Sequence, residues 1–196
     1  DERGRQTRDA RYSWRRARTT FGHLHPHHID RDLCRIFISD CRADGLSDSY
    51  IRGMVNLVSA ACHWHDKATP ATFEAPPPSP PRDRHLTRDE AARLIAGASA
   101  PHIRLWIVLA LTTAARAGAI LDLTWDRVHI DRRYIDLGAG RGGKRRAKPP
   151  INASALGALL EAREAGLTDY VIEYAGGPVK SIKRGFATAC RQADLK

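Results

Sequence analysis

The chain contains 196 residues, of which 32 are Lys or Arg and 22 are Asp or Glu, so its formal net charge at pH 7 is +10. This length allows one large or two small domains, each with its own hydrophobic core. No apolar run reaches the roughly 18 to 20 residues that cross a bilayer, which excludes a membrane-spanning helix. The charge favours a polyanionic partner such as nucleic acid, although acidic proteins and membrane surfaces also attract basic proteins.

The first 20 residues form a basic segment in which seven arginines stand against three acidic residues. We expect an arm that runs into a short helix over residues 12–19, and such arms often lie along DNA phosphates. For residues 1–10 a disordered, merely solubilising tail is an alternative. The candidate DNA contacts of this segment are Arg11, Arg15, Arg16 and Arg18.

Two amphipathic helices are predicted next, over residues 30–43 and 47–64. Apolar residues recur at helical spacing in both, and Gly45 separates the two helices. Ser47 is a suitable N-terminal cap for the second helix, because its hydroxyl can accept a hydrogen bond from a free backbone amide. Arg52 lies in this second helix and is a further candidate DNA contact.

Histidines and cysteines are grouped near these helices, but they do not form a recognisable metal motif. The histidines are His23, His25, His27, His28, His63 and His65, and the cysteines are Cys34, Cys41, Cys62 and Cys190. Their spacing matches no common zinc signature, so we expect no metal, and histidines that cap helices or contact the DNA backbone. The scattered cysteines suit reduced thiols in a cytosolic protein better than a disulfide framework.

A proline-rich segment over residues 66–86 carries six prolines and no apolar periodicity. Such a composition is typical of an extended, semi-rigid linker. The predicted domain organisation is therefore a basic arm and helical domain over residues 1–65, a linker over 66–86 and a second domain over 87–196.

The second domain begins with a capping box, in which Thr87 precedes Glu90 by three residues. An almost uncharged helix is then predicted over residues 105–115 and ends at Arg116. A short apolar helix follows, so we expect Arg116 to lie where two buried helices meet. A buried guanidinium needs a carboxylate, backbone carbonyls or an anionic ligand, because it cannot lose its proton.

Alternating apolar residues after Trp125 predict a β-hairpin over residues 128–137. Residues 144–151 are expected to form a third strand at the edge of the sheet, because two consecutive prolines exclude a central position. The remaining predicted elements are a helix over 153–165, a short strand over 171–174 and a helix over 180–193. Basic residues in this part that could contact DNA are Arg141, Arg145, Arg146, Lys148, Lys180 and Lys183.

The stretch around Arg116 resembles the first catalytic-arginine box of the tyrosine recombinases, the phage-integrase family. Members of this family carry an apolar helix, then Thr-x-x-Arg, a short apolar run and a Trp before a β-strand. Thr113, Arg116 and Trp125 occupy these positions here. Many members have Glu three residues after the arginine, where this chain has Ala119, and this difference leaves open which group orients Arg116.

The resemblance extends to both sides of this box. Residues 1–65, with Phe-Gly-x-Leu at 21–24 and Gly-Leu-Ser at 45–47, are similar to the helical core-binding domain of the family. Residues 140–152 resemble the hairpin that carries the catalytic lysine, and Lys144 is the best match. The expected fold class is therefore mainly α with a small antiparallel β-sheet. It comprises a helical core-binding (SAM-like) domain and the N-terminal part of a tyrosine-recombinase catalytic domain.

The resemblance implies a role for each of these two residues. Arg116 would contact the non-bridging oxygens of the scissile phosphate, and Lys144 would donate a proton to the leaving 5′ oxygen. The plainer alternatives are a salt-bridged arginine in a helical hairpin and a solvated basic hairpin that only touches phosphate.

The implied function is site-specific DNA recombination or integration through a 3′-phosphotyrosine intermediate, without a cofactor. The implied partners are double-stranded DNA and further copies of the chain on DNA, a tetramer in the family. The implied location is the bacterial cytoplasm, in a nucleoid-associated protein encoded by a bacterium or a phage. The His-x-x-Arg and tyrosine boxes of the family would follow Lys196, so we expect these 196 residues to be catalytically silent. The alternative is a non-catalytic DNA-binding module, a truncated or decayed integrase. A basic structural or RNA-binding protein would not explain the Arg116 box.

Overall fold

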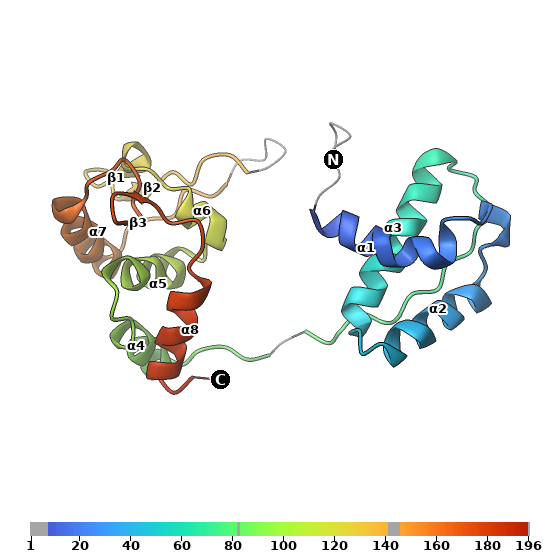
Figure 1. Cartoon of the computed structure of the whole chain (residues 1–196). Coiled ribbons are helices and arrows are strands. Elements are labelled where there is room, and N and C mark those ends of the chain that lie inside the picture. The colour runs from blue at the N-terminus through green and yellow to red at the C-terminus, as the bar shows by residue number, and fades with distance from the viewer. Residues whose placement is uncertain (1–7, 82, 141–145, 196) are drawn as a thin grey trace. The chain divides into compact units, whose positions relative to one another are not determined.

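The computed structural model of the chain describes residues 8–81, 83–140 and 146–195. The chain divides into two compact units, Asp1–Asp83 and Arg84–Lys196, which we call the first and the second unit (Figure 1). Among the helices of the described residues, none combines the length and the apolar character needed to cross a membrane.

The described residues of the first unit form three α-helices and one short 3-10 helix. They are α1 (Arg8–Phe21), η1 (Pro26–His28), α2 (Arg31–Ala43) and α3 (Asp48–His65). The Asp30 carboxylate accepts a hydrogen bond from the Leu33 amide at the start of α2, over 2.8 Å. The Ser47 hydroxyl caps α3 in the same way, through the Tyr50 amide. These caps satisfy amide groups that have no partner inside the helix.

The core of the first unit forms where α1 and α2 pack on α3. Phe21 of α1 meets Phe37 of α2 edge-on, with 5.0 Å between the ring centroids. Ile51 and Met54 of α3 are fully buried beside them. Burying side chains of this size contributes about 1.5 to 3 kcal/mol each, which is enough to hold a small three-helix unit together.

Part of the proline-rich segment lies on the first unit. Ala71 is buried in its core, and the Thr72 amide donates to the Ile29 carbonyl over 3.0 Å. The Pro76 carbonyl accepts a hydrogen bond from the Arg52 guanidinium over 2.6 Å. Residues 71–76, expected to lie within an extended linker, therefore cover the side of α3.

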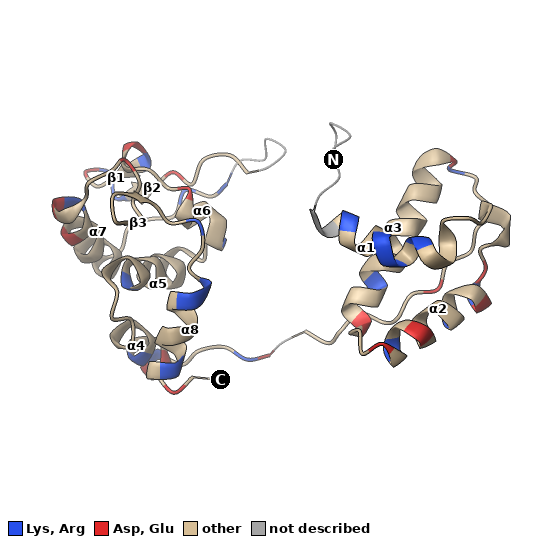
Figure 2. Cartoon of the chain, viewed as in Figure 1, with Lys and Arg blue, Asp and Glu red and all other residues tan. Residues whose placement is uncertain are grey.

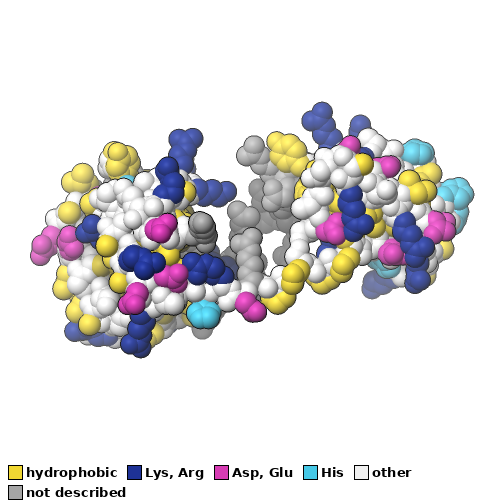
Figure 3. Space-filling model, turned by 90° about the horizontal axis from the view of Figure 1, so that it is seen from below, with side chains coloured by type: hydrophobic (Ala, Val, Ile, Leu, Met, Phe, Trp, Pro, Cys, Tyr) yellow, Lys and Arg dark blue, Asp and Glu magenta, His cyan; other side chains and the backbone are white. Residues whose placement is uncertain are grey.

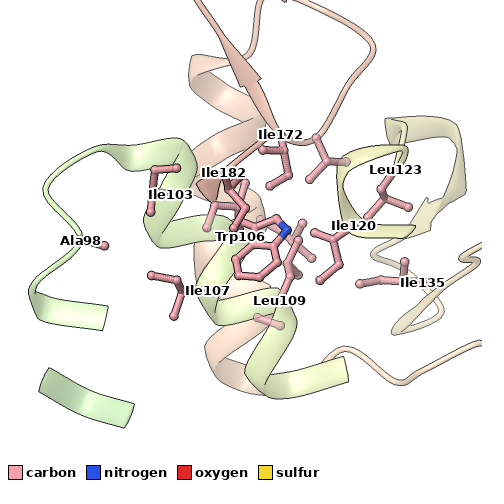
Figure 4. Packing of buried hydrophobic residues seen from close by; sticks show 14 of the residues in the cluster. Ala98, Ile103, Trp106, Ile107, Leu109, Ile120, Leu123, Ile135, Ile172 and Ile182 are labelled. Carbon is pink, nitrogen blue, oxygen red and sulfur yellow. The ribbon is translucent and has the colours of Figure 1, made fainter. Parts of the chain in front are cut away.

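The second unit is built around α5 (Pro101–Thr113), which is apolar on almost every side. The other elements are α4 (Arg88–Ala96), α6 (Ala117–Leu121), η2 (Trp125–Arg127), β1 (Val128–His129), β2 (Tyr134–Ile135), α7 (Ala153–Ala165), β3 (Glu173–Tyr174), β4 (Gly177–Pro178) and α8 (Lys183–Gln192). Helices α4, α6 and α7 all contact α5. Figure 4 shows Trp106 and Leu109 of α5 pointing toward Ile120 of α6 and toward Ile172. A helix that is apolar all round is stable in water only when neighbours cover it in this way.

The two β-ladders of the second unit are short and antiparallel. Val128 pairs with Ile135 in the first ladder, as the predicted hairpin requires. Residues 144 and 145 of the expected third strand over 144–151 lie outside the described residues, and residues 146–151 pair with β2 only at the Tyr134–Pro150 bridge. Pro149 and Pro150 have no amide hydrogen to donate, so the ladder cannot propagate through them.

The last part of the second unit differs from the prediction in a similar way. The strand expected over residues 171–174 forms only at Glu173–Tyr174, and it pairs with Gly177–Pro178. Ala175 and Gly176 make the two-residue turn between these strands, both with positive φ, as the commonest hairpin turns require. Because this hairpin occupies the preceding segment, α8 begins at Lys183 and not at residue 180.

Helix α8 packs so closely against the end of α4 that Gly97 leaves no room for a side chain. A Cβ at this position would lie 2.9 Å from the Ala189 carbonyl oxygen and 3.2 Å from the Ala193 amide nitrogen, both in the backbone of α8 or its cap. Gly97→Ala should therefore lower the free energy of unfolding of the second unit by about 1 to 3 kcal/mol, as overpacking does. Thermal or denaturant unfolding of the full chain measures the change.

Gly157→Ala is the matched control, because nothing lies within 4 Å of a Cβ at this exposed position inside α7. This variant should raise the free energy of unfolding by about 0.5 to 1 kcal/mol, since alanine favours a helix interior over glycine. Equal effects of the two substitutions would contradict the close packing of α4 on α8.

Candidate nucleic-acid interface

Helix α1 carries a stripe of exposed arginines along one side. Arg11, Arg15 and Arg18 are spaced four and three residues apart, which places them on one helix face. Ala17 and Phe21 are buried in the core of the first unit. The positions coloured blue recur along α1 in Figure 2. We call Arg11, Arg15 and Arg18 the α1 stripe.

The α1 stripe differs from the other surface arginines of the first unit in its lack of acidic partners. No ion pair joins these three guanidinium groups to any acidic residue whose side chain the structure describes. Arg35 and Arg42 of α2, by contrast, pair with Glu74 and Asp48 at 2.9 and 2.8 Å. On the face that Figure 3 shows from below, Lys and Arg side chains lie among Asp and Glu side chains on both units. The α1 stripe is therefore available to an external anion.

Arg16, which was also predicted to contact DNA, is bound to residues of its own unit. Its guanidinium pairs with the Asp44 carboxylate at 2.8 Å and lies 5.6 Å from the centre of the Phe37 ring. It is half-buried and joins α1 to the end of α2. Arg52 has a similar environment through its hydrogen bond to the Pro76 carbonyl. The guanidinium groups of Arg16 and Arg52 therefore already have partners inside the first unit.

Two exposed aromatic residues lie between the arginines of the α1 stripe in the sequence. The side chains of Tyr12 and Trp14 are 55% and 37% exposed. Large aromatic side chains on a basic helix can pack against sugars or bases, while the arginines pair with phosphates. Tyr12 and Trp14 were not among the predicted DNA contacts, although two aromatic residues between Arg11 and Arg15 were a sequence signal for them.

Arg116 is the N-terminal cap residue of α6, and its side chain is exposed. The expectation of a buried guanidinium between two helices is therefore wrong. Helix α5 ends at Thr113, and Ala114 adopts the left-handed conformation with φ 51°, which turns the chain outward before Arg116. The Arg116 side chain forms no ion pair or hydrogen bond with the described residues. Ala119, where many tyrosine recombinases have Glu, is buried in the core of the second unit.

Arg146, which lies between β2 and α7, connects its part of the chain to residues near α6. The Arg146 guanidinium donates to the Leu137 carbonyl over 3.2 Å and lies 3.9 Å from the Asp122 carboxylate, which follows α6. The Arg146 amide also donates to the Gly138 carbonyl. Arg146 thus connects this segment to the C-terminal end of α6, the helix whose N-terminal cap is Arg116. Arg141, Lys144 and Arg145 lie outside the described residues.

Lys148, another predicted DNA contact, pairs with the Asp136 carboxylate at 2.8 Å. The hydrogen bond from Lys148, assisted by one from the Gly138 amide, lowers the pKa of Asp136. A carboxylate with a lowered pKa is ionised throughout the neutral range, so this ion pair persists there. Lys180 and Lys183, near the start of α8, are exposed and form no ion pair with the described acidic residues.

Three histidines of the first unit, His25, His27 and His28, lie together at η1. The rings of His25 and His27 stack with 3.8 Å between their centroids, and His28 lies edge-on to both. Within the part of the chain that the structure describes, no group of three or more His, Cys, Asp or Glu side chains could hold a metal ion.

Two tyrosines of the second unit take part in local structure. Tyr170 pairs with Thr124 through a β-bridge and is half-buried. The Tyr174 ring contacts the His102 ring, with 4.9 Å between their centroids.

Comparisons with known proteins show the fold of the chain. No family model and no curated protein sequence matches this sequence. The structure is similar to a lambda integrase dimer bound to a COC′ core site, with a TM-score of 0.76 and 18% identity over 100% of this chain and 77% of that one. It is also similar to a lambda integrase tetramer bound to a Holliday junction, with a TM-score of 0.77 and 18% identity over 100% of this chain and 63% of that one. The Tn1549 transposon integrase in complex with transposon right end DNA has a TM-score of 0.69 and 15% identity, over 91% of this chain and 70% of that one. The chain therefore has the lambda integrase fold across both units.

Proposed function

We propose that the chain is an integrase-like protein that binds duplex DNA, in the manner of a tyrosine recombinase. The observation that carries this proposal is the α1 stripe, which is exposed, basic and without described acidic partners. Its place in a fold shared with integrases solved on DNA supports the same conclusion. Unpaired arginines on a helix suit the phosphate backbone, because each releases a condensed counterion when it binds.

We further propose that both units contact the duplex. The first unit would use the α1 stripe, and the second would use Lys180, Lys183 and the basic residues Arg141, Lys144 and Arg145. The proline-rich segment joins the two units and would allow them to approach DNA together. Arg16, Arg52, Arg146 and Lys148 would act indirectly, since each already has a partner inside its unit.

The proposed roles of Arg116 and Lys144 follow from the family that these motifs resemble. The Arg116 guanidinium is exposed at the start of α6 and has two terminal nitrogens available for the non-bridging oxygens of a phosphate. A fixed positive group there would stabilise the charge that grows on the phosphate in the transition state. Lys144 would protonate the leaving 5′ oxygen, and no metal or cofactor takes part in this scheme.

A non-catalytic DNA-binding module is the second candidate. It is favoured by the absence of any described residue that orients the Arg116 side chain, since catalysis requires a positioned guanidinium. This module would use the same DNA-binding surface. We expect either protein to act on DNA in the bacterial cytoplasm and to assemble with further copies on DNA.

Substitution of Arg116 separates the two candidates. Arg116→Ala should lower duplex affinity by no more than roughly fivefold, because one charge-assisted contact contributes about 1 kcal/mol among many. In a recombinase whose chain also supplies the tyrosine nucleophile, it should slow strand cleavage by about 100-fold or more, the effect of removing a transition-state charge stabiliser. Affinity is measured by fluorescence anisotropy, and cleavage by trapping a covalent protein–DNA adduct on a nicked duplex.

Arg88→Ala is a suitable control, since Arg88 is an exposed arginine of α4 outside the Arg116 box. It should change neither affinity nor adduct formation. The 196 residues alone should form no adduct, so the comparison is made in a chain that also carries the tyrosine nucleophile. There, an adduct that disappears only in Arg116→Ala supports the recombinase, whereas tight binding without any adduct supports the non-catalytic module. If Arg116→Ala reduces binding and cleavage equally, Arg116 is an anchor for DNA and has no role specific to the transition state.

A further inference from the structure

The second unit contains a groove that DNA binding does not explain. It has a volume of about 450 Å³ and lies between the first half of α5 and the second half of α7, with the β3–β4 hairpin at one end. Leu105 and Val108 line the α5 wall. Ala158, Ala162 and Ala165 line the α7 wall, where their small side chains leave the groove open. Apolar walls with this volume can accept large hydrophobic side chains.

Two large apolar side chains at the rim of the groove are mostly exposed. Leu167 is 81% exposed and Tyr174 is 67% exposed. Tyr174 is held in place by its contact with the His102 ring. Partial burial lowers the pKa of His102, so the imidazole is neutral near pH 7 and adds no charge to the groove. An open groove beside such side chains is typical of a surface that a protein partner covers.

The charges on the two walls identify the partner. Arg104 lies on the α5 wall, where its Nε donates to the Ala98 carbonyl and its terminal nitrogens have no described partner. Glu161 lies on the α7 wall and forms no ion pair or hydrogen bond with the described residues. The other carboxylate of the groove, Glu173, already accepts hydrogen bonds from the Leu167 amide and the Thr168 hydroxyl. One available cation and one available anion therefore face the groove from opposite walls.

We propose that a second copy of this chain covers the groove in a twofold-symmetric dimer. A twofold interface repeats every contact, so residue i meets residue j and residue j meets residue i. Glu161 of each copy pairs with the partner's Arg104, and each pair of opposite charges forms twice. Leu167 and Tyr174 of each copy enter the groove of the other, which removes their apolar surface from water.

The dimer surface is separate from the proposed DNA-binding surface. The α1 stripe belongs to the first unit, whereas the groove belongs to the second, and neither Lys180 nor Lys183 lines the groove. Dimerisation can therefore be measured on the full chain without DNA, and DNA binding can be measured on the same variants. A failure of one proposal leaves the other untouched.

Charge reversal and mixing test the proposal. In a dimer of Glu161→Arg, two arginines face each other at each of the two contacts. In a dimer of Arg104→Glu, two glutamates face each other there. Each variant alone should raise the dimer dissociation constant by at least roughly tenfold, as like charges do when they face each other at an interface. An equimolar mixture of the two should dimerise again, since both pairs then carry opposite charges. Sedimentation velocity of the full chain measures all of these species.

The control variant is Glu164→Arg, which makes the same charge change on α7 outside the groove and should leave the dimer intact. Circular dichroism of each variant checks that the exposed substitutions preserve the fold. A wild-type chain that remains monomeric at high concentration overturns the proposal, as does a groove that binds only a different protein. Single variants that dimerise normally, or a mixture that does not dimerise, overturn it as well.

Discussion

Raising the salt concentration from about 50 to about 200 mM should lower the affinity of the chain for duplex DNA by roughly 10³ to 10⁵. This range corresponds to roughly 6 to 10 phosphate contacts, each of which releases a condensed counterion on binding. The α1 stripe supplies three of them, and the remaining contacts would come from Lys180, Lys183 and the basic residues among positions 141–145. Fluorescence anisotropy at several salt concentrations gives the slope of log affinity against log salt.

The slope also tests whether both units take part. A nearly flat dependence of affinity on salt would exclude a protein that binds the DNA phosphates through basic residues of both units. A slope of roughly three, as expected for the α1 stripe alone, would restrict DNA binding to the first unit. The measurement is made on the full chain with a duplex long enough to span both units.

Replacing the α1 stripe with glutamines should produce the second large effect. The Arg11→Gln, Arg15→Gln, Arg18→Gln triple variant should lose roughly 100-fold or more in affinity, because each charge-assisted phosphate contact contributes about 1 kcal/mol or more. The salt slope should fall by about three, one for each phosphate contact removed. The three side chains are exposed and have no described ion pairs, so the fold of the first unit should be unchanged.

A control with the same net charge separates a local contact from a general charge effect. Arg31→Gln, Lys67→Gln, Arg88→Gln removes three exposed basic side chains that form no ion pair with the described acidic residues. Both triple variants lower the formal charge from +10 to +7. The control should lose little affinity. Equal losses in the two variants would mean that net charge, and not the α1 stripe, attracts the DNA.

The sequence by itself determined the helices whose signals are local. The caps at Asp30, Ser47 and Thr87 each act on an amide three residues away, so the starts of α2, α3 and α4 could be predicted from short stretches. Helix α7 has the predicted bounds, 153–165, because Asn152 caps it and Gly166 follows it. The mainly helical fold class follows from the same kind of pattern.

Only the tertiary structure decided which basic residues remain available for a ligand. Arg16 pairs with Asp44, 28 residues away, and Arg52 bonds to Pro76, 24 residues away, so neither contact could be predicted from neighbouring residues. The exposure of Arg116 depends on a left-handed turn at Ala114, and alanine carries no sequence signal for that conformation. The groove between α5 and α7 exists because segments 50 residues apart pack side by side. Local backbone preferences act over a few residues. The pairing of charges and the burial of side chains depend instead on how distant helices pack, so they are determined only when the chain has folded.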